Sequence, residues 1–417
     1  MNTTRNHIKE ALGRNLSLSS KLFLKGLFAG FKRLAVGTVT TAPPPEIGDR
    51  PRIIVFDERV PSPDRDAGSG RMFMILKTLA EWSHVVFVPF NRPQGIEYER
   101  ALWKEGIETA DAVDYRRLLK HKNVKAAIVS RPSIGKALVR RIRRVNPEVK
   151  IVFDMVDTHF IRLEREYQLT GSAITFKQAK RYRKLEQRIG EASDLIWCAS
   201  VEDKQVMARE VLSTRIEVVP TIHPLHDSGK TFEGRRDLLF VGNFAHRPNN
   251  DGIIFFLKEI YPLIRKAISD VNLDIIGDNV SAEISAYHSE QVRVRGYVPD
   301  IGPYLRACRV FIAPLRFGAG IKGKVGEAMS FGIPVVTTSI GAEGFGLTDE
   351  LNAMVADTPE AFAAAVTRLY SDKALWDLLA ENSRFHVEKH FTPEVIAHTI
   401  NNSIREVSGL KPIINAD

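Results

Sequence analysis

The stretch from Arg316 to Val336, RFGAGIKGKVGEAMSFGIPVV, combines residue types that suit a phosphorylated ligand. Its glycines allow the main chain to approach a ligand closely. Lys322 and Lys324 would face negative charge, and Glu327, three residues after Lys324, would accept hydrogen bonds from hydroxyl groups. Together these residue types indicate a sugar nucleotide, because its diphosphate and its hydroxyls need both kinds of partner.

The same stretch directly follows an apolar run, RVFIAPL (309–315), so we expect it to lie at the carboxyl end of a strand. A helix is expected to begin near Lys324, with its unpaired N–H groups and its dipole attracting an anion. Glu327 would then lie one turn along on the same face. A flexible strand–helix connection with solvated lysines is the alternative, but it does not account for the combination.

Two series of short apolar runs alternate with amphipathic stretches, a pattern typical of parallel strands with right-handed crossovers. The sequence therefore predicts an α/β fold of two Rossmann-like, doubly wound parallel-sheet domains that face each other across a cleft. Ligands of such sheets bind outside the carboxyl ends of the strands. The predicted strands are 52–57, 84–90, 124–130, 150–156, 194–200 and 215–220, then 237–243, 271–277, 292–298, 309–315, 333–338 and 352–357.

The length of 417 residues also favours two domains. The pattern divides the chain into a basic segment with a proline-rich linker (1–50), a first α/β domain (51–222), a linker (223–236), a second α/β domain (237–390) and a last helical segment (391–417).

Composition excludes several classes of protein. With 44% hydrophobic and 26% charged residues, the chain is typical of a soluble globular protein. No stretch approaches the roughly 18 uninterrupted apolar residues of a membrane-spanning helix. Cys198 and Cys308 are too few and too far apart in the sequence to form a metal site by themselves, and they fit a reducing cytosol.

The net charge of +9 is concentrated at the amino-terminal end, where residues 1–36 hold seven lysines and arginines and one acid. Within them, LSLSSKLFLKGLFAGFKRLAVG interleaves apolar and basic residues at helical spacing. Such a helix can lie on an anionic membrane surface, and a tail that packs on the protein is the alternative. Lys25 argues against a signal peptide, and no motif indicates nucleic-acid binding.

The second half resembles the donor domain of the GT-B glycosyltransferases of family 4, also called glycosyl transferases group 1. The similar motifs, in order, are FVGNFAHRPNNDGIIFF, DIIGD, VRGYVPDIGPYLRAC, FIAPLRFGAGIKGKVGEAMSFGIPVVTTSIGAEGF and HFTPEVIAHTI. The first half resembles the matching acceptor domain through DERVPSPDRDAGSGRMF and FDMVDTHFIRLERE. The resemblance implies that 51–222 is the acceptor-side domain, that 237–390 is the nucleotide-sugar donor domain, and that the last helix (391–417) crosses back to the first domain.

The resemblance assigns roles by position. Glu327 matches the second acid of the E-x7-E motif, which binds the ribose hydroxyls, whereas the first acid, which contacts the donor sugar, is replaced by Ala319. Backbone amides are expected to substitute for the missing carboxylate, and they belong to Gly318, Ala319, Gly320 and Ile321.

A basic pair usual in the family falls near Asn243 and Pro248, so Arg247, Lys322 and Lys324 are the expected replacements in diphosphate binding. The resemblance also places Tyr297 and Val298 where main-chain groups hold the base.

The first half is expected to form the opposite wall of the site. In DAGSGR (66–71), Gly68, Ser69 and Gly70 would let the backbone approach the sugar–phosphate, with a tight strand–helix turn as the alternative. The DRD sequence at 64–66 imitates a metal-binding motif of another architecture, and we predict no metal there. His159 matches a histidine near the reacting sugar. A titration near pH 7 would suit it to acceptor orientation or proton handling, with a capping or packed histidine as the alternative.

These features predict a glycosyltransferase that moves a hexose-type sugar from a nucleoside-diphosphate donor to a hydroxyl of a glycan or lipid-linked acceptor. The resemblance implies retention of configuration and a place in bacterial cell-surface polysaccharide or glycolipid assembly. His159, Lys324 and Glu327 are the expected catalytic residues, and no cofactor is expected. We expect a cytoplasmic protein, peripheral on the inner face of the membrane if residues 1–36 bind it. A sugar-nucleotide epimerase and a non-catalytic partner subunit are the alternatives.

Overall fold

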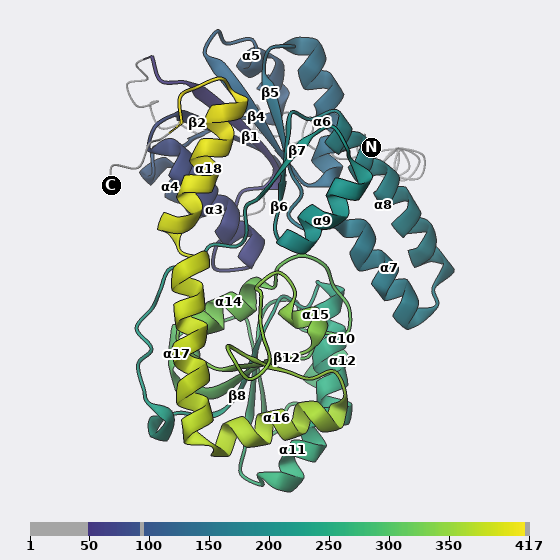
Figure 1. Ribbon diagram of the computed structural model, residues 1–417, viewed down its shortest axis with the longest axis vertical. Coiled ribbons are helices and arrows are strands. Elements are labelled where there is room, and N and C mark those ends of the chain that lie inside the picture. The colour runs from purple at the N-terminus through teal and green to yellow at the C-terminus, as the bar shows by residue number, and fades with distance from the viewer. Residues whose placement is uncertain (1–48, 92–95, 413–417) are drawn as a thin grey trace, which may run out of the picture.

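The computed structural model describes residues 49–91 and 96–412, and Figure 1 shows them as two α/β domains stacked along the long axis of the molecule. The basic segment 1–36, on which the expectation of membrane contact rests, lies outside the described residues. Within the described ranges, no helix combines the length and the apolar character needed to cross a bilayer.

The first domain is built on a seven-stranded sheet in which all neighbouring strands are parallel. Helices cover both faces, which is why its strands are apolar runs without alternation. In spatial order the strands are β3 (Glu108–Thr109), β2 (His84–Asn91), β1 (Arg52–Arg59), β4 (Val124–Ser130), β5 (Lys150–Asp154), β6 (Leu195–Cys198) and β7 (Arg215–Val218).

The second domain repeats this plan with six parallel strands. They are, in spatial order, β10 (Val292–Gly296), β9 (Leu273–Ile276), β8 (Arg236–Val241), β11 (Cys308–Ala313), β12 (Val335–Thr337) and β13 (Met354–Val355).

Both sheets reverse their order of winding next to their first strand, between β1 and β4 and between β8 and β11. A crevice forms at such a switch point, outside the carboxyl ends of the strands. The predicted fold class, two doubly wound parallel-sheet domains, is confirmed.

The helices of the first domain are α3 (Ala67–Ala80), α4 (Ile96–Lys104), α5 (Tyr115–Leu119), α6 (Pro132–Val145), α7 (His159–Thr170), α8 (Ala173–Glu191) and α9 (Val201–Glu210). Those of the second are α10 (Arg247–Phe255), a π-helical turn (Phe256–Ile260), α11 (Tyr261–Ala267), α12 (Ala282–Ser285), α13 (Gly302–Ala307), α14 (Gly323–Ser330), α15 (Ser339–Ala342), α16 (Pro359–Ser371) and α17 (Lys373–His390). Short 3-10 turns lie at Ala112–Asp114 and Phe232–Gly234.

Each sheet separates two apolar clusters, because successive side chains of a strand point to opposite faces. In β1, Ile54 and Phe56 belong to one cluster, and Ile53 and Val55 belong to the other. The second sheet is packed in the same way on its two faces.

The last helix, α18 (Pro393–Val407), leaves the second domain and packs on the first, as the yellow end of the chain shows in Figure 1. Trp197 Nε1 of β6 donates to Ser403 Oγ at 3.1 Å, and Trp82 Nε1 donates to Asn401 Oδ1 at 2.7 Å. The chain thus crosses between the domains after β7 and again before α18. The two crossings adjoin, since the backbone N–H of His223 donates to the carbonyl of Phe391 at 2.8 Å.

The junction before β8 depends on Arg235, whose side chain is fully buried. Its guanidinium donates to the carbonyls of Leu305 and Cys308, at 2.7 and 3.1 Å. It also donates to the carbonyls of Ser228, Lys230 and Phe331. The planar fork of five N–H donors matches these scattered acceptors in a way that an ammonium group cannot.

We expect Arg235→Met to lower the free energy of unfolding by about 3 kcal/mol, because it leaves several buried carbonyls without donors. Arg235→Lys should recover only a small part of that loss. Chemical denaturation followed by circular dichroism measures both variants, with the exposed neighbour substituted as Arg236→Met for comparison. A loss no larger in Arg235→Met than in Arg236→Met would show that these hydrogen bonds do not stabilise the domain.

Candidate active site

The loop that connects β11 to α14 lies between the two domains. α14 begins at Gly323, one residue before the expected start, and its first turn leaves N–H groups without intrahelical partners. Gly320 has a φ of +66°, and a Cβ there would come within 3.1 Å of the Cβ of Asp157 in the first domain. A Cβ on Gly323 would lie 2.3 Å from the Cβ of Ala67. These glycines therefore allow the two domains to approach each other, besides any approach to a ligand.

Lys322 points into this interdomain region and is only 6% exposed. Its ammonium donates to the carbonyl of Gly320 at 2.5 Å and lies 3.7 Å from a carboxylate oxygen of Glu343. Desolvation lowers the pKa of Lys322 to about 8, and the negative charges of Glu343 and Asp203 offset only part of that effect.

Lys324 is held by an amide and an aromatic ring. Its ammonium donates to Asn249 Oδ1 at 2.5 Å and lies 4.3 Å from the ring centre of Phe240. In the described part of the chain, no carboxylate forms an ion pair with it. Desolvation, and then the charge of Lys322, lower the pKa of Lys324 to about 7. Neither ammonium group points into bulk solvent.

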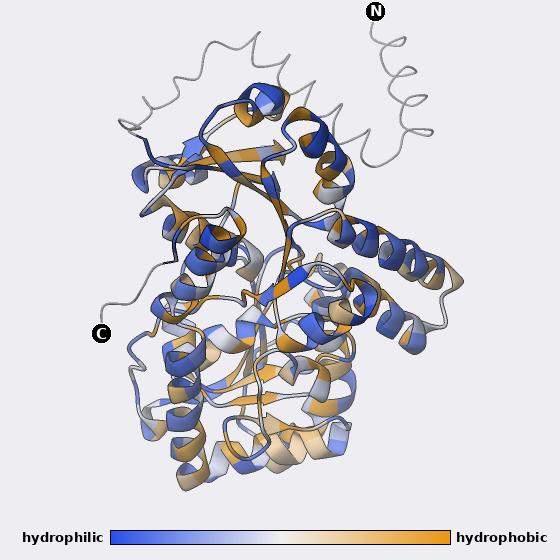
Figure 2. Ribbon diagram, turned by 45° about the horizontal axis from the view of Figure 1, so that its top comes forward, coloured by the Kyte–Doolittle hydropathy of each residue, from blue (hydrophilic) through white to orange (hydrophobic). Residues whose placement is uncertain are grey.

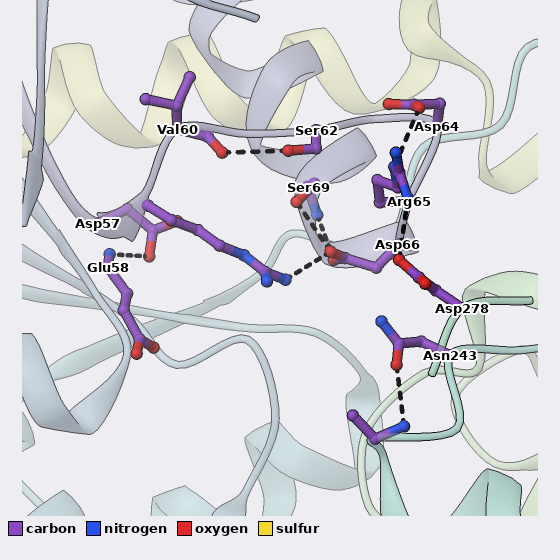
Figure 3. Close-up of polar contacts among 12 residues, drawn as sticks. Asp57, Glu58, Val60, Ser62, Asp64, Arg65, Asp66, Ser69, Asn243 and Asp278 are labelled. Carbon is purple, nitrogen blue, oxygen red and sulfur yellow. Dashed lines mark hydrogen bonds and ion pairs between the residues drawn. The ribbon is translucent and has the colours of Figure 1, made fainter. Parts of the chain in front are cut away.

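The loop after β8 positions Asn249, the hydrogen-bond partner of Lys324. Asn249 in α10 also donates through Nδ2 to the carbonyl of Asn243 at 2.9 Å. The side chain of Asn243 accepts from the N–H of Ala245, so it orders its own loop (Figure 3). Arg247, expected to bind a diphosphate, instead pairs with Glu166 of α7 across the domains, while more than half of its side chain stays exposed.

Glu327 lies in the second turn of α14 and faces two histidines of the interdomain linker. Its carboxylate oxygens lie 3.4 Å from Nδ1 of His223 and 3.9 Å from Nε2 of His226. Burial alone would raise the pKa of Glu327, but the hydrogen bond and charge of His223 bring it below its ordinary value. A third of the side chain stays exposed, so the carboxylate remains open to a ligand.

His159 begins α7 and is enclosed by acids. Its Nδ1 lies 2.9 Å from Oδ1 of Asp157 and 3.2 Å from Oε1 of Glu186, and its ring stacks on Tyr182. Burial would lower the pKa of His159, but the two carboxylates raise it to about 10. The side chain is therefore cationic at neutral pH, and the expected titration near pH 7 is not found.

The turn that carries Asp157 and His159 has a strained backbone. Val156, a β-branched residue, has a φ of 68°, in a region that such residues rarely adopt. Strain of this kind persists only where surrounding contacts impose it, and it is common at functional sites. Here Arg162 fixes the turn through its Nε, which lies 3.0 Å from Oδ2 of Asp157.

Arg165 of α7 joins this turn to the loop of the second domain. Its guanidinium donates to both carboxylate oxygens of Glu343, each at 2.6 Å, and to the carbonyl of Gly318 at 2.8 Å. The carboxylate of Glu343 thus lies between Arg165 and Lys322. This bidentate contact spans the two domains and, through the carbonyl of Gly318, orders the loop that also contains Ala319.

The start of α3 forms the wall on the first domain. Asp66 caps the helix by accepting from the N–H of Ser69 at 2.8 Å and from its hydroxyl at 3.0 Å (Figure 3). A Cβ on Gly68 would lie 3.8 Å from both Arg131 and Val156, near the switch point of the first sheet. Gly70 lies within α3, and a Cβ there would have only the carbonyl oxygen of Pro63 nearby, at 4.0 Å.

The DRD sequence contacts the second domain. The carboxylate of Asp64 accepts from the hydroxyls of Tyr98 and Tyr297. Arg65 pairs with Asp278 at 2.9 Å (Figure 3). The guanidinium of Arg65 also covers the ring of Tyr297. Over the described ranges, no group of three or more histidines, cysteines and acids is placed to hold a metal ion.

The structure therefore brings His159, Asp157, Lys322 and Lys324 to one interdomain region, with Glu327 one turn further along α14. Tyr297 lies at the far side of the same interface, and Val298 packs partly buried against the second core. Sequence reasoning gave His223 and His246 no role. His223 contacts Glu327, and His246, at the start of α10, lies in the electrostatic field of Asp157. No local signal identified either residue, since both lie in loops.

Comparison with known proteins agrees with this geometry. Residues 235–372 match the family model described as glycosyl transferases group 1. A 44.6 kDa protein in the cps region of Klebsiella pneumoniae is 27% identical over 192 residues, 44% of this chain and 49% of that protein. YtcC of Bacillus subtilis is 34% identical over 111 residues, 26% of this chain and 27% of YtcC. The matches thus span half or less of each relative.

Solved structures are similar over most of the chain. Sucrose-phosphate synthase of Thermosynechococcus elongatus has a TM-score of 0.64 at 16% identity, over 86% of this chain and 100% of that one. Anabaena HepE in complex with UDP-glucose has a TM-score of 0.65 at 12% identity, over 85% and 99%. At such identities the likeness establishes the fold, which is GT-B.

The ion pairs of His159 predict a characteristic dependence of stability on pH. Because folding raises its pKa to about 10, its contribution is complete below about pH 6.5 and is lost as the pH rises through 10. The difference in melting temperature between the native chain and His159→Gln should therefore be largest below pH 6.5 and shrink towards pH 10. His398→Gln, at an exposed position, controls for the loss of a histidine. A difference that stays constant from pH 6 to 10 would contradict the assigned charge.

Proposed function

We propose that this chain is a glycosyltransferase that moves a sugar from a nucleoside-diphosphate donor to a hydroxyl acceptor. The observation that carries the proposal is the pair formed by the buried Lys322 and the half-buried Lys324 at the amide-rich start of α14, which faces the other domain. An anion that bound there would offset the cost of burying two like charges. Glu327 would accept from the ribose hydroxyls one turn further along the helix.

The donor would lie against the carboxyl ends of the second sheet. HepE has been solved with UDP-glucose, TarM with UDP, and the pneumococcal transferase GtfA with UDP and GlcNAc. A uridine diphosphate sugar is therefore the first donor to test. With the first acid replaced by Ala319, the sugar would be bound by the amides of Gly318 to Ile321, in a loop ordered by Arg165 and Glu343.

The chemical step breaks the bond between the anomeric carbon and the leaving phosphate oxygen and forms one to the acceptor oxygen. Negative charge grows on the diphosphate, and Lys322, Lys324 and the amides of α14 would stabilise it. We propose that the acceptor proton passes to the leaving phosphate oxygen on the same face, which retains configuration. No metal or other cofactor takes part in this scheme.

His159 would act as a fixed cation rather than as a base. Its Nδ1 is engaged by Asp157 and Glu186, so its Nε2–H is the group available to donate to the acceptor or to a sugar hydroxyl. A positive charge there also lies close to the developing charge on the diphosphate. Of the two roles expected from the sequence, these contacts favour acceptor orientation over proton handling.

For the acceptor we propose a glycan or lipid-linked sugar in the assembly of a bacterial cell-surface polysaccharide or glycolipid, such as lipopolysaccharide. The relative in the cps region of Klebsiella pneumoniae supports a polysaccharide. Such an acceptor would place the protein in the cytoplasm or on the inner face of the membrane.

We expect Lys324→Met to lower the rate of sugar transfer at least about 100-fold, because it removes a charge from the leaving-group site. The melting temperature should not fall, since the burial of this ammonium is itself unfavourable. Turnover of a panel of sugar nucleotides, followed by release of the nucleoside diphosphate, measures the effect, with the exposed Lys266→Met as control. A full-rate Lys324→Met enzyme would remove the leaving-group role.

Binding of UDP should take up protons at pH 8. Lys324, with a pKa of about 7, is mostly neutral there, and Lys322, with a pKa of about 8, is half protonated. A bound diphosphate favours both charged forms, so we expect an uptake of roughly one proton and an affinity that falls from pH 7 to 9. Calorimetry in two buffers of different ionisation enthalpy measures the uptake. An uptake of zero, or the same uptake in Lys324→Met, would contradict the placement.

A further inference from the structure

The helices α6 and α8 carry an unusual excess of positive charge on the first domain. Together they contain eleven lysines and arginines and two glutamates, an excess as large as the net charge of +9 of the whole chain. The two helices pack against each other, since a Cβ on Gly135 of α6 would lie 2.9 Å from the side chain of Ile189 of α8. One of the two glutamates, Glu186, is fully buried on His159.

The charges of α8 form a continuous row. Lys177, Arg181, Lys184 and Arg188 follow one another at spacings of four, three and four residues, so they share one helical face. All four side chains are exposed, and none forms an ion pair within the described ranges. The basic residue with acidic partners, Arg183, points elsewhere, to Glu164 of α7 and Glu210 of α9. We call this row the basic face of α8.

A second row lies on α6, where Lys136, Arg140 and Arg144 are spaced by four residues and exposed. Arg140 and Arg144 line, with Glu191, a hollow at the end of α8. The two rows therefore extend one positively charged region over adjoining helices.

The tip of the α7–α8 hairpin is apolar. Leu169 at the end of α7 and Ile174 and Phe176 at the start of α8 are 42%, 71% and 37% exposed, respectively. The ammonium of Lys180 lies 4.2 Å from the ring centre of Phe176, so charge and apolar surface adjoin. The hairpin extends away from the body of the domain (Figures 1 and 2), and its mostly hydrophilic colouring in Figure 2 reflects the basic face.

The inner face of α8 belongs to the candidate active site. Tyr182 stacks on His159 at 5.3 Å, and Glu186 accepts from it. A surface that contacted the basic face would thus lie about 10 Å from His159, one helix diameter away. A lipid-linked acceptor held in that surface would need to travel only a short distance to the cleft.

We infer that the basic face of α8, together with the row on α6 and the apolar tip of the hairpin, docks on an anionic lipid surface. Lysines and arginines of one sign along several helical turns are attracted to acidic headgroups, and exposed apolar side chains at one end insert at the boundary of the acyl chains. An acidic protein or a soluble polyanion would use the charges, but it would not need the projecting apolar tip. The residues of this site belong to α6, α7 and α8 and are not part of the basic segment 1–36.

The test uses the full chain and vesicles of phosphatidylcholine alone or mixed with phosphatidylglycerol, and it measures the bound fraction by flotation. Reversing the basic face as Lys177→Glu, Arg181→Glu and Lys184→Glu should weaken binding to the mixed vesicles more than about 100-fold. The matched control, Lys122→Glu, Lys266→Glu and Lys389→Glu, makes the same change of charge at exposed sites elsewhere and should weaken binding far less. Melting temperature and UDP affinity, measured in both variants, establish that the fold is intact.

A second pair of variants tests the tip. The double variant Ile174→Ser and Phe176→Ser should bind mixed vesicles about tenfold more weakly, and this loss should persist at high salt. The control, Leu212→Ser with Phe385→Ser at exposed positions elsewhere, should bind as the native chain does. The inference is overturned if the reversed face and its control bind vesicles equally well. It is also overturned if the native chain binds vesicles of phosphatidylcholine alone as strongly as it binds the mixed vesicles. Binding to heparin without binding to either kind of vesicle would overturn it too. Loss of transferase activity with vesicle binding retained would count against the proposed function and not against the lipid surface.

Discussion

The constraint on which the candidate site depends is the removal from water of two ammonium groups, those of Lys322 and Lys324. Lys322 keeps one carboxylate at 3.7 Å, and Lys324 has only an amide oxygen and the ring of Phe240 within reach. Burying like charges without full pairing is unfavourable, as the lowered pKa of both side chains reflects. Beside them lie the unpaired amides at the start of α14. A bound diphosphate would supply the negative charge that the ammonium of Lys324 lacks among its described partners.

The fold was largely predictable because parallel strands buried on both faces are unmistakable apolar runs. The strand at 124–130 was predicted at its observed bounds. The strand predicted at 150–156 ends at Asp154, because its apolar run continues into the turn where Val156 adopts a positive φ. β3 was missed, since two residues at the edge of a sheet carry no periodicity.

The candidate site was predictable only where its residues are close in sequence. The glycine loop, the two lysines and Glu327 lie within ten residues, so their spacing indicated their chemistry. His223 contacts Glu327 from 104 residues away, and Arg165 reaches Glu343 from 178 residues away. Nothing local distinguishes His223 or Arg165 from other loop histidines and surface arginines. Arg247 and Tyr297 were placed by analogy of position, but their side chains bind the opposite domain instead. Their ligand roles remain predictions.

The hydrogen bond between His223 and Phe391 joins the two places where the chain passes from one domain to the other. Because both crossings adjoin at this hydrogen bond, this point would be the pivot of any relative motion of the two domains. The pivot lies beside Glu327, because the imidazole of His223 contacts that carboxylate. Any opening would therefore move Glu327 least. Asp278, which pairs with Arg65 of the first domain, lies further from the pivot and would move more. A nucleotide would be bound first near the pivot, and the cleft would then close over the reacting end of the donor.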